Sequence, residues 1–162
     1  MYDISGRKEM LYKLTRAVLL GLILSTIGVL PANAENACQA ALTKTRNKLI
    51  SKNVQVSYIS TFNVQERSWR KSPSQYPIGV SVVFEGKAAE SIMASPAFLK
   101  ALGHEIVMSC EPVSIVEFGI YSTDYIHILG LSGSNKVEWF ECVDASNTHI
   151  LNSLPWGYTY CL

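Results

Sequence analysis

Residues 95–119 read SPAFLKALGHEIVMSCEPVSIVEFG, and this stretch predicts a helix, a stop and a strand. Ser95 suits the N-cap, where its hydroxyl can accept a hydrogen bond from a helix amide, and Pro96 suits the first helical position. Pro112 cannot continue the helix. Apolar residues recur at helical spacing, namely Leu99, Leu102, Ile106 and Cys110. We therefore expect one face of this helix to cover a core.

The flanking sequence predicts one more helix and five strands. Residues 36–51 are rich in helix formers, and the segments expected as strands are 54–62, 78–85, 113–121, 125–131 and 136–143. Short connections make the last three strands an antiparallel meander. Residues 65–73 carry three basic side chains and are expected to be a solvated loop. The predicted class is α+β: two helices packed on a mostly antiparallel sheet of about five strands, stapled by disulfides.

Residues 1–34 have the pattern of a signal peptide. A basic leader precedes an uncharged apolar run, residues 17–30, and a small-x-small motif ends at Ala34. The run is shorter than the roughly 20 residues that span a bilayer. We expect cleavage after Ala34, with no stable membrane anchor afterwards, although an uncleaved anchor is the alternative. Met10 is a possible true start. The exported product, periplasmic or extracellular, would be a single domain, residues 35–162.

All four cysteines lie in that domain. An exported chain with an even number of cysteines favours disulfides, and four cysteines allow three pairings. We favour Cys110 with Cys142, which would join the central helix to the sheet, and Cys38 with Cys161, which would join the first helix to the tail. A thiol catalyst or a metal site is the rival interpretation. The sequence has no Cys-x-x-Cys or Cys-x-x-His spacing to support either.

The charge balance gives no strong partner preference. Residues 35–162 carry ten Lys plus Arg and eleven Asp plus Glu. A nucleic-acid-binding protein would normally show a basic stripe, so no nucleic-acid partner is expected. No phosphate-binding glycine loop or metal-ligand spacing is present, so no cofactor or metal is implied. The identity of any partner stays open.

Several segments together resemble a known group of proteins. They are Ser95 to Leu99, the run to Ser109-Cys110, Val116 to Gly119, and Trp139-Phe140-Glu141-Cys142. In these segments the chain resembles small secreted cyanobacterial proteins of uncharacterised function. The resemblance implies an exported fold and assigns no catalytic or binding residue.

Four aromatic residues near the C-terminus are the candidate contacts for a ligand: Trp139, Trp156, Tyr158 and Tyr160. Aromatic side chains with a polar tip suit a surface that is half dry and half wet. The first hypothesis is therefore an exported, non-enzymatic binding or structural module. The competing interpretation is that these rings simply cover the sheet as part of the core.

The alternative function is a small periplasmic hydrolase that uses His127 with a strand carboxylate such as Glu138. Strand alternation predicts that His127 shares a face with Tyr125 and Leu129, where it could lie beside Trp139. His104 is expected to meet solvent and His149 to lie in a loop. Histidine is a common general base, but an isolated strand histidine more often makes structural hydrogen bonds. Whether the protein is an enzyme stays open.

Overall fold

The computed structural model describes residues 32–67, 69–133, 136–144 and 154–160. The chain divides into two compact units, Met1–Ala32 and Asn33–Leu162, and the second contains nearly all of the described residues. Most of the predicted signal peptide, with its possible start at Met10, lies outside the described residues, as do His149 and Cys161. None of the helices in the described ranges has the length and apolarity to cross a membrane.

The helices and strands follow the predicted order, with additions. The helices are α2 (Ala32–Ile50), the short 3-10 helix η2 (Val64–Glu66), α3 (Ala89–Met93) and α4 (Pro96–Ser109). The strands are β1 (Gln55–Asn63), β2 (Trp69–Arg70), β3 (Ile78–Glu85), β4 (Val113–Ile120), β5 (Ile126–Leu131), β6 (Val137–Trp139), β7 (Glu141–Val143), β8 (Leu154–Pro155) and β9 (Tyr158–Tyr160).

Five strands form the main sheet, in the order β1-β3-β4-β5-β6. Only β3 and β4 run parallel, and every other neighbouring pair is antiparallel. A parallel pair needs a long crossover, and here α3 and α4 supply it. The α+β class is therefore confirmed, with the meander present as β4, β5 and β6.

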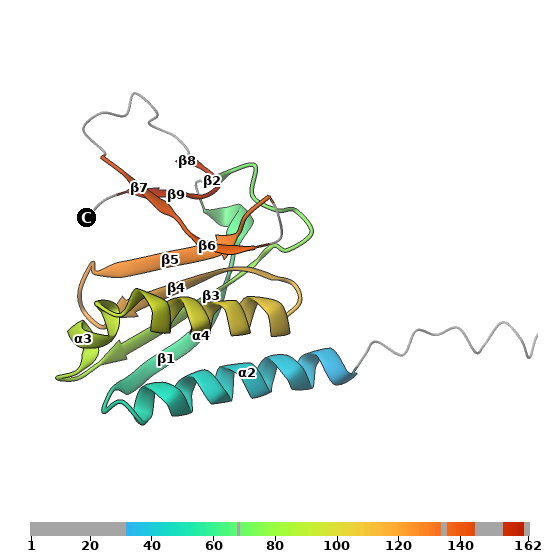
Figure 1. The fold of residues 1–162 in the computed structure, drawn as a ribbon. Coiled ribbons are helices and arrows are strands. Elements are labelled where there is room, and N and C mark those ends of the chain that lie inside the picture. Colours follow the sequence, from blue (N-terminus) through green and yellow to red (C-terminus); the bar gives the residue numbers. More distant parts are fainter. Residues whose placement is uncertain (1–31, 68, 134–135, 145–153, 161–162) are drawn as a thin grey trace, which may run out of the picture. The chain divides into compact units, whose positions relative to one another are not determined.

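The main core lies between the sheet and the two long helices, which run side by side in Figure 1. Alternate residues of the central strands point to these helices, among them Val82, Phe118 and Leu129, all with no exposed surface. The apolar stripe predicted for α4 meets them, since Leu99, Leu102, Ile106 and Cys110 are fully buried. Burial of this stripe fixes α4 on the sheet.

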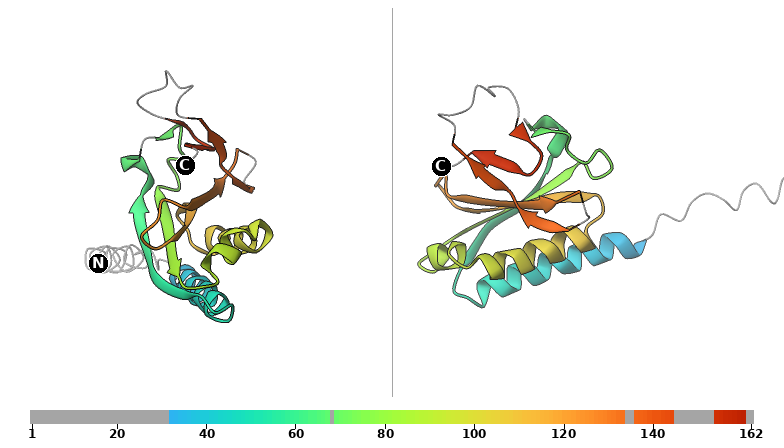
Figure 2. Two further views of the ribbon diagram at one scale, coloured as in Figure 1. Left: turned by 90° about the vertical axis from the view of Figure 1, so that its left-hand side faces the viewer. Right: turned by 45° about the horizontal axis from the view of Figure 1, so that its top comes forward.

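A smaller apolar cluster covers part of the opposite face of the sheet. Its buried members are Val64, Ile115, Ile128 and Phe140, with Phe62, Trp69 and Trp156 packed against them. The prediction of a solvated loop at residues 65–73 is wrong for Trp69. The Trp69 ring makes edge contacts with Phe140 and Trp156, and its Nε1 donates to the Tyr158 carbonyl at 2.8 Å. Figure 2 shows the short C-terminal strands on this side, away from the helices.

Both predicted cysteine pairings are wrong. Cys38 of α2 is bonded to Cys110 at the end of α4, with 4.3 Å between the Cα atoms. The bond thus joins the two long helices, which lie next to one another on the same face of the sheet. Cys142 is also disulfide-bonded. The error arose because helix adjacency is a tertiary property that cysteine spacing does not encode.

Ser95 precedes α4 as predicted, but its hydroxyl does not cap that helix. It donates instead to the Ser91 carbonyl at 2.9 Å, in the last turn of α3. Because α3 ends at Met93, its final carbonyls need donors, and Ser95 satisfies one of them. The hydroxyl therefore serves the preceding helix.

Candidate functional site

The last predicted strand is split into two, and the split opens a cleft. β6 pairs with β5 from Val137 to Trp139, whereas β7 leaves the sheet and pairs with β9 in parallel. Phe140 marks the separation, where its amide still donates to the Ile128 carbonyl at 2.9 Å. Its ring lies against Gly130 of β5, where an added Cβ would lie 2.9 Å from a ring carbon.

The cleft lies between the uncovered edge of β5 and the strands β7 and β9, and has a volume of about 380 Å³. This volume falls within the usual range for ligand sites. Its lining comes from four places in the sequence: the start of α4, the turn and strand around β5, the β6–β7 segment, and β9. Residues far apart in the chain therefore converge on one cavity.

Aromatic rings from β6, from β5 and from the residue just before β5 form one wall. Leu129 lies opposite Trp139 in the antiparallel register, so His127, two residues away on the same face, lies beside Trp139. The ring centroids of His127 and Trp139 are 5.5 Å apart, and those of Tyr125 and His127 are 5.4 Å apart. The predicted neighbourhood of His127 is thus confirmed. The rings are inclined by 60° and 61°, so they bound a cavity and do not form a flat platform.

The backbone of β5 is open toward this cleft at Ile126. The amide of Ile120 donates to the Tyr125 carbonyl, and β4 pairs onward with β5 as far as Ile115. Alternation in an antiparallel ladder then turns the N–H and C=O of Ile126 away from β4. No described strand pairs with β5 at Ile126 on that outer side.

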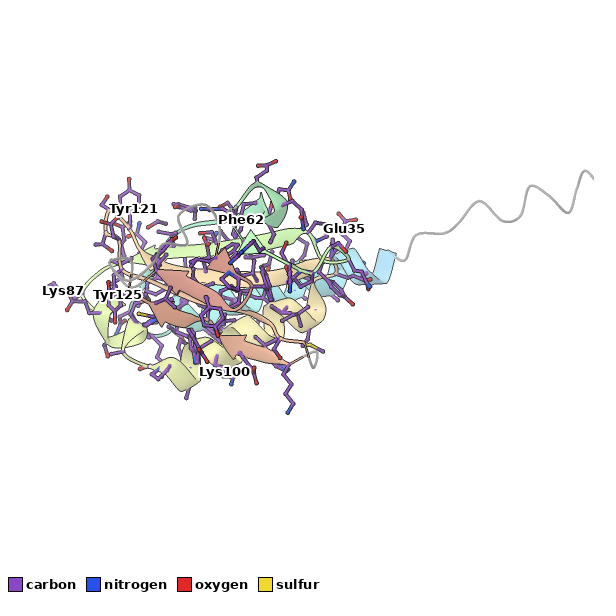
Figure 3. The ribbon with its side chains drawn as sticks, turned by 90° about the horizontal axis from the view of Figure 1, so that it is seen from above. Glu35, Phe62, Lys87, Lys100, Tyr121 and Tyr125 are labelled. Atoms are coloured by element: carbon purple, nitrogen blue, oxygen red, sulfur yellow. A yellow bond between two sulfur atoms is a disulfide. The ribbon has the colours of Figure 1, made fainter. Side chains whose placement is uncertain are left out.

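Large exposed apolar side chains gather at the cleft. Among the described residues, Tyr125 is 44% exposed, Ile126 41% and Tyr160 38%, and all three belong to the lining. Tyr121, at 52%, precedes the same turn, and Figure 3 shows it at the same end of the sheet as Tyr125. Clustered exposed apolar surface is typical of interaction sites. Among the residues that the structure describes, the lining has one carboxylate, Asp124, and no lysine or arginine.

The four predicted contact residues separate into two groups. Trp139 and Tyr160 line the cleft. Trp156 packs in the smaller apolar cluster, and its Nε1 donates to the Leu131 carbonyl at 2.6 Å, so we interpret its role as structural. Tyr158 and Trp156 border a second hollow of about 240 Å³ on another side of β6. Tyr125 and Asp124 were not predicted as contacts, because their only signal is their place next to a strand turn.

His127 and Glu138 are not brought together. Glu138 lies opposite Gly130 on β5, whereas His127 shares its face with Leu129. The two side chains therefore point to opposite faces of the sheet. His127 lines the cleft and Glu138 lines the second hollow. The pair proposed for hydrolysis is not assembled, because the register places the two residues out of phase. His104 is exposed on α4, as predicted.

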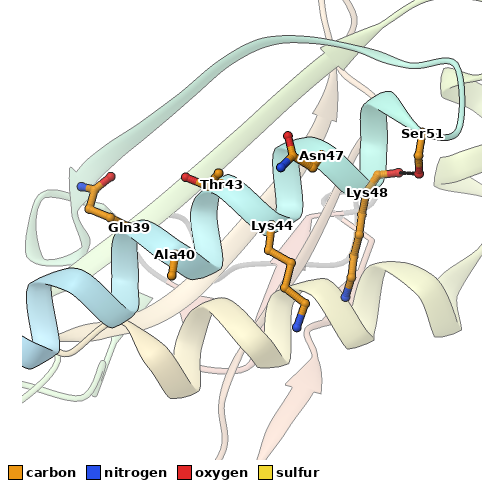
Figure 4. Close-up of a pocket in the computed structure, with 7 residues that line it drawn as sticks. All are labelled: Gln39, Ala40, Thr43, Lys44, Asn47, Lys48 and Ser51. Carbon is orange, nitrogen blue, oxygen red and sulfur yellow. Dashed lines mark hydrogen bonds between the residues drawn. The ribbon is translucent and has the colours of Figure 1, made fainter.

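A larger hollow, about 600 Å³, lies over the outer surface of α2 (Figure 4). All of its described lining residues come from this one helix and its end, so no second wall from the described part of the chain faces them. Its two lysines, Lys44 and Lys48, both form ion pairs with Glu105 of α4. A hydrogen bond from Lys44 is the main reason why the pKa of Glu105 lies below its ordinary value. We interpret these lysines as part of the contact between α2 and α4, and not as a ligand site.

A second carboxyl with a shifted pKa, that of Glu117, lies near Arg67, the residue that follows η2. The side chain of Glu117 on β4 is only 12% exposed, and Arg67 approaches it at 3.7 Å. Burial raises the pKa of Glu117, and the Arg67 charge partly opposes this shift. Arg67 also lies over the Phe62 ring, 4.7 Å from its centroid. Glu117 lines neither the cleft nor the two hollows described above, so we interpret it as a buried structural group.

Within the described ranges, no three His, Cys, Asp or Glu side chains gather as a metal site would require. Comparisons with protein-family models, with curated proteins and with solved structures found no match. The geometry of the cleft is therefore the basis for any inference about function.

Proposed function

We propose that this protein is an exported, non-enzymatic binding module and that it holds its ligand in the cleft beside β5. One observation carries the proposal: the cleft combines a concave wall of aromatic rings with three exposed apolar side chains, Tyr125, Ile126 and Tyr160. Exposed apolar surface of this kind gains free energy when a partner covers it and removes it from water. The Cys38–Cys110 disulfide is compatible with an exported protein.

The position of the cleft supports a recognition role. It lies at the end of a sheet that is fixed by its core, with Leu129 and Phe118 fully buried next to His127. His127 and Trp139 are themselves partly buried, so their rings are held by packing. A rigid wall of this kind reduces the entropy that a binding site loses when it is occupied.

The test is a screen of small fragments by nuclear magnetic resonance. The uniformly ¹⁵N-labelled protein, produced by a bacterial host that expresses the full chain, would be titrated with a fragment library containing aromatic amines, short peptides and sugars. We expect the amide shift changes to concentrate at Asp124 to Ile128, Trp139 and Tyr160.

Two exposed tyrosines provide the variant and its control. Tyr160→Ser should weaken the hits severalfold, because Tyr160 lines the cleft. Tyr58→Ser should leave them unchanged, because Tyr58 is similarly exposed, at 46%, but lies on β1 at the far edge of the sheet. Hits that avoid the cleft, or that cluster over α2, would refute the proposed site.

A further inference from the structure

Building on the proposed function, we infer that the ligand is an extended segment of a partner protein, which adds as a strand to β5 at Ile126 and places a basic side chain between the rings and Asp124. Two features of the cleft support this ligand, and a small-molecule site needs neither of them. One is the open strand edge, and the other is the combination of aromatic rings with a single negative charge.

The open edge supplies the first feature. The N–H and C=O of Ile126 point into the cleft, and the natural partner for one donor and one acceptor at this spacing is another extended backbone. β6 and the Phe140 amide already use this edge from Ile128 to Leu131, so an added strand would extend the sheet next to Phe140, where this pairing stops. Unpaired strand edges are sites where other chains attach.

The side chains supply the second feature. The described part of the lining has Asp124 and no lysine or arginine, so it favours a positive charge. Rings of Tyr125, Trp139 and Tyr160 surround the same space, and aromatic faces attract cations. A lysine or arginine side chain would satisfy both, with its methylene stem on the rings and its charge toward Asp124.

The inclination of the rings argues against a polysaccharide as the ligand. Sugars stack on exposed flat aromatic faces, whereas His127 is tilted by about 60° to both of its neighbours. A fourth ring, that of Tyr160, comes from β9 across the cleft. Such walls enclose a single side chain better than they support a row of sugar rings.

The test starts from random linear peptides of twelve residues displayed on phage and selected on the exported protein. We expect the selected peptides to share a lysine or arginine within an extended apolar context. The best peptide would then be synthesised, and its affinity measured by fluorescence anisotropy. N-methylation of alternate backbone amides should weaken binding at least tenfold in one of the two alternation phases and much less in the other, because only alternate residues face the β5 edge.

Variants of the protein separate the backbone from the side chains. Ile126→Pro removes the outward N–H and leaves the β4 ladder intact, so it should weaken the peptide at least tenfold, while Ile126→Val should bind normally. Asp124→Asn should weaken the binding of a peptide that carries the basic residue. It should weaken the binding of the same peptide less when norleucine replaces that residue. Glu90→Gln, an exposed carboxyl on α3, is the matched control for charge. If Ile126→Pro does not fold, the N-methylated peptides still decide the question.

Each contrary result has its own meaning. Peptides that bind in the cleft without sensitivity to N-methylation would refute strand addition and leave the proposed function standing. Binding of chitopentaose or cellopentaose in the cleft, in place of peptides, would also refute strand addition and leave the proposed function standing. A dimer by light scattering that Ile126→Pro dissociates would make a second copy the occupant and overturn the inference. If neither peptides nor fragments bind at the cleft, the proposed function itself fails.

Discussion

Removal of the disulfide between Cys38 and Cys110 should lower the stability of this protein by several kcal/mol. The bond joins residues 72 positions apart. Closing a loop of this length reduces the entropy of the unfolded chain and so raises its free energy by about 4 kcal/mol in the chain-entropy treatment. Cys110 has no exposed surface, so its replacement by alanine also removes a buried sulfur, which costs on the order of 1 kcal/mol. The double variant Cys38→Ala/Cys110→Ala should therefore lose about 5 kcal/mol in all.

The loss should be largest in α2. This helix buries few side chains, and its buried residues Ala41, Thr45 and Leu49 lie toward the C-terminal half. Cys38 is the covalent attachment of its N-terminal half, and the ion pairs of Lys44 and Lys48 with Glu105 are partly exposed and contribute little. Without the disulfide, we expect hydrogen exchange to accelerate first at the beginning of α2.

Urea unfolding followed by far-ultraviolet circular dichroism measures the global effect. With a slope of about 2 kcal/mol per M, a loss of 5 kcal/mol lowers the midpoint by roughly 2.5 M. The control is Gln39→Ala/Met108→Ala, which changes two exposed neighbours on the same helices. A midpoint that falls by less than about 0.5 M, together with unchanged exchange in α2, would refute the reasoning, since a fall that small is about a fifth of the one expected.

Three further predictions concern packing and charge. Gly103→Ala should destabilise the protein by about 1–2 kcal/mol in thermal unfolding, because the new Cβ would lie 2.2 Å from a methyl group of the fully buried Leu129, and a gain in helix propensity offsets part of that strain. When Leu129 is also replaced by alanine, Gly103→Ala should lower the stability by less. An equal loss with and without Leu129 would contradict the proposed clash between the two residues. Because the pKa of Glu117 is raised, its protonated form is favoured in the folded state, so stability should fall as pH rises from about 4.5 through the folded pKa. Glu117→Gln should abolish that slope in urea titrations, and an unchanged slope would exclude Glu117 as its source. Because the pKa of Glu105 is lowered, its ionised form should contribute less than about 1 kcal/mol to the free energy of unfolding above pH 4.5. This contribution should be lost as pH falls through the folded pKa, and Glu105→Gln should show no such loss.

The local signals of the sequence were sufficient for most of the helices and strands. α4 was predicted within one residue at each end because a proline, an apolar stripe and a second proline all mark it. β3 matches its prediction because a run of β-branched residues ends at Gly86. The helix at α2 was also expected, although it begins at Ala32 and not at residue 36.

The sequence predicted only one part of the cleft, the contact between His127 and Trp139. Alternation correctly placed His127 beside Trp139, since both lie on paired strands joined by a short turn. The same alternation could not show that the chain after Trp139 leaves the sheet. That departure depends on β9, which pairs with β7 from a distant part of the chain. Without it, Tyr160 would have no reason to lie near Trp139.

The sequence by itself determined the α+β class, the helical stripe and the strand faces, because these depend on side-chain periodicity and on prolines, which act over a few residues. Only the tertiary structure decided which cysteines meet, that Trp69 is half-buried against two other rings, and that β7 separates from β5 to open the cleft. Those outcomes depend on contacts between segments many residues apart. The free energies of alternative contacts compete during packing, and such contacts produce no periodic pattern in the sequence.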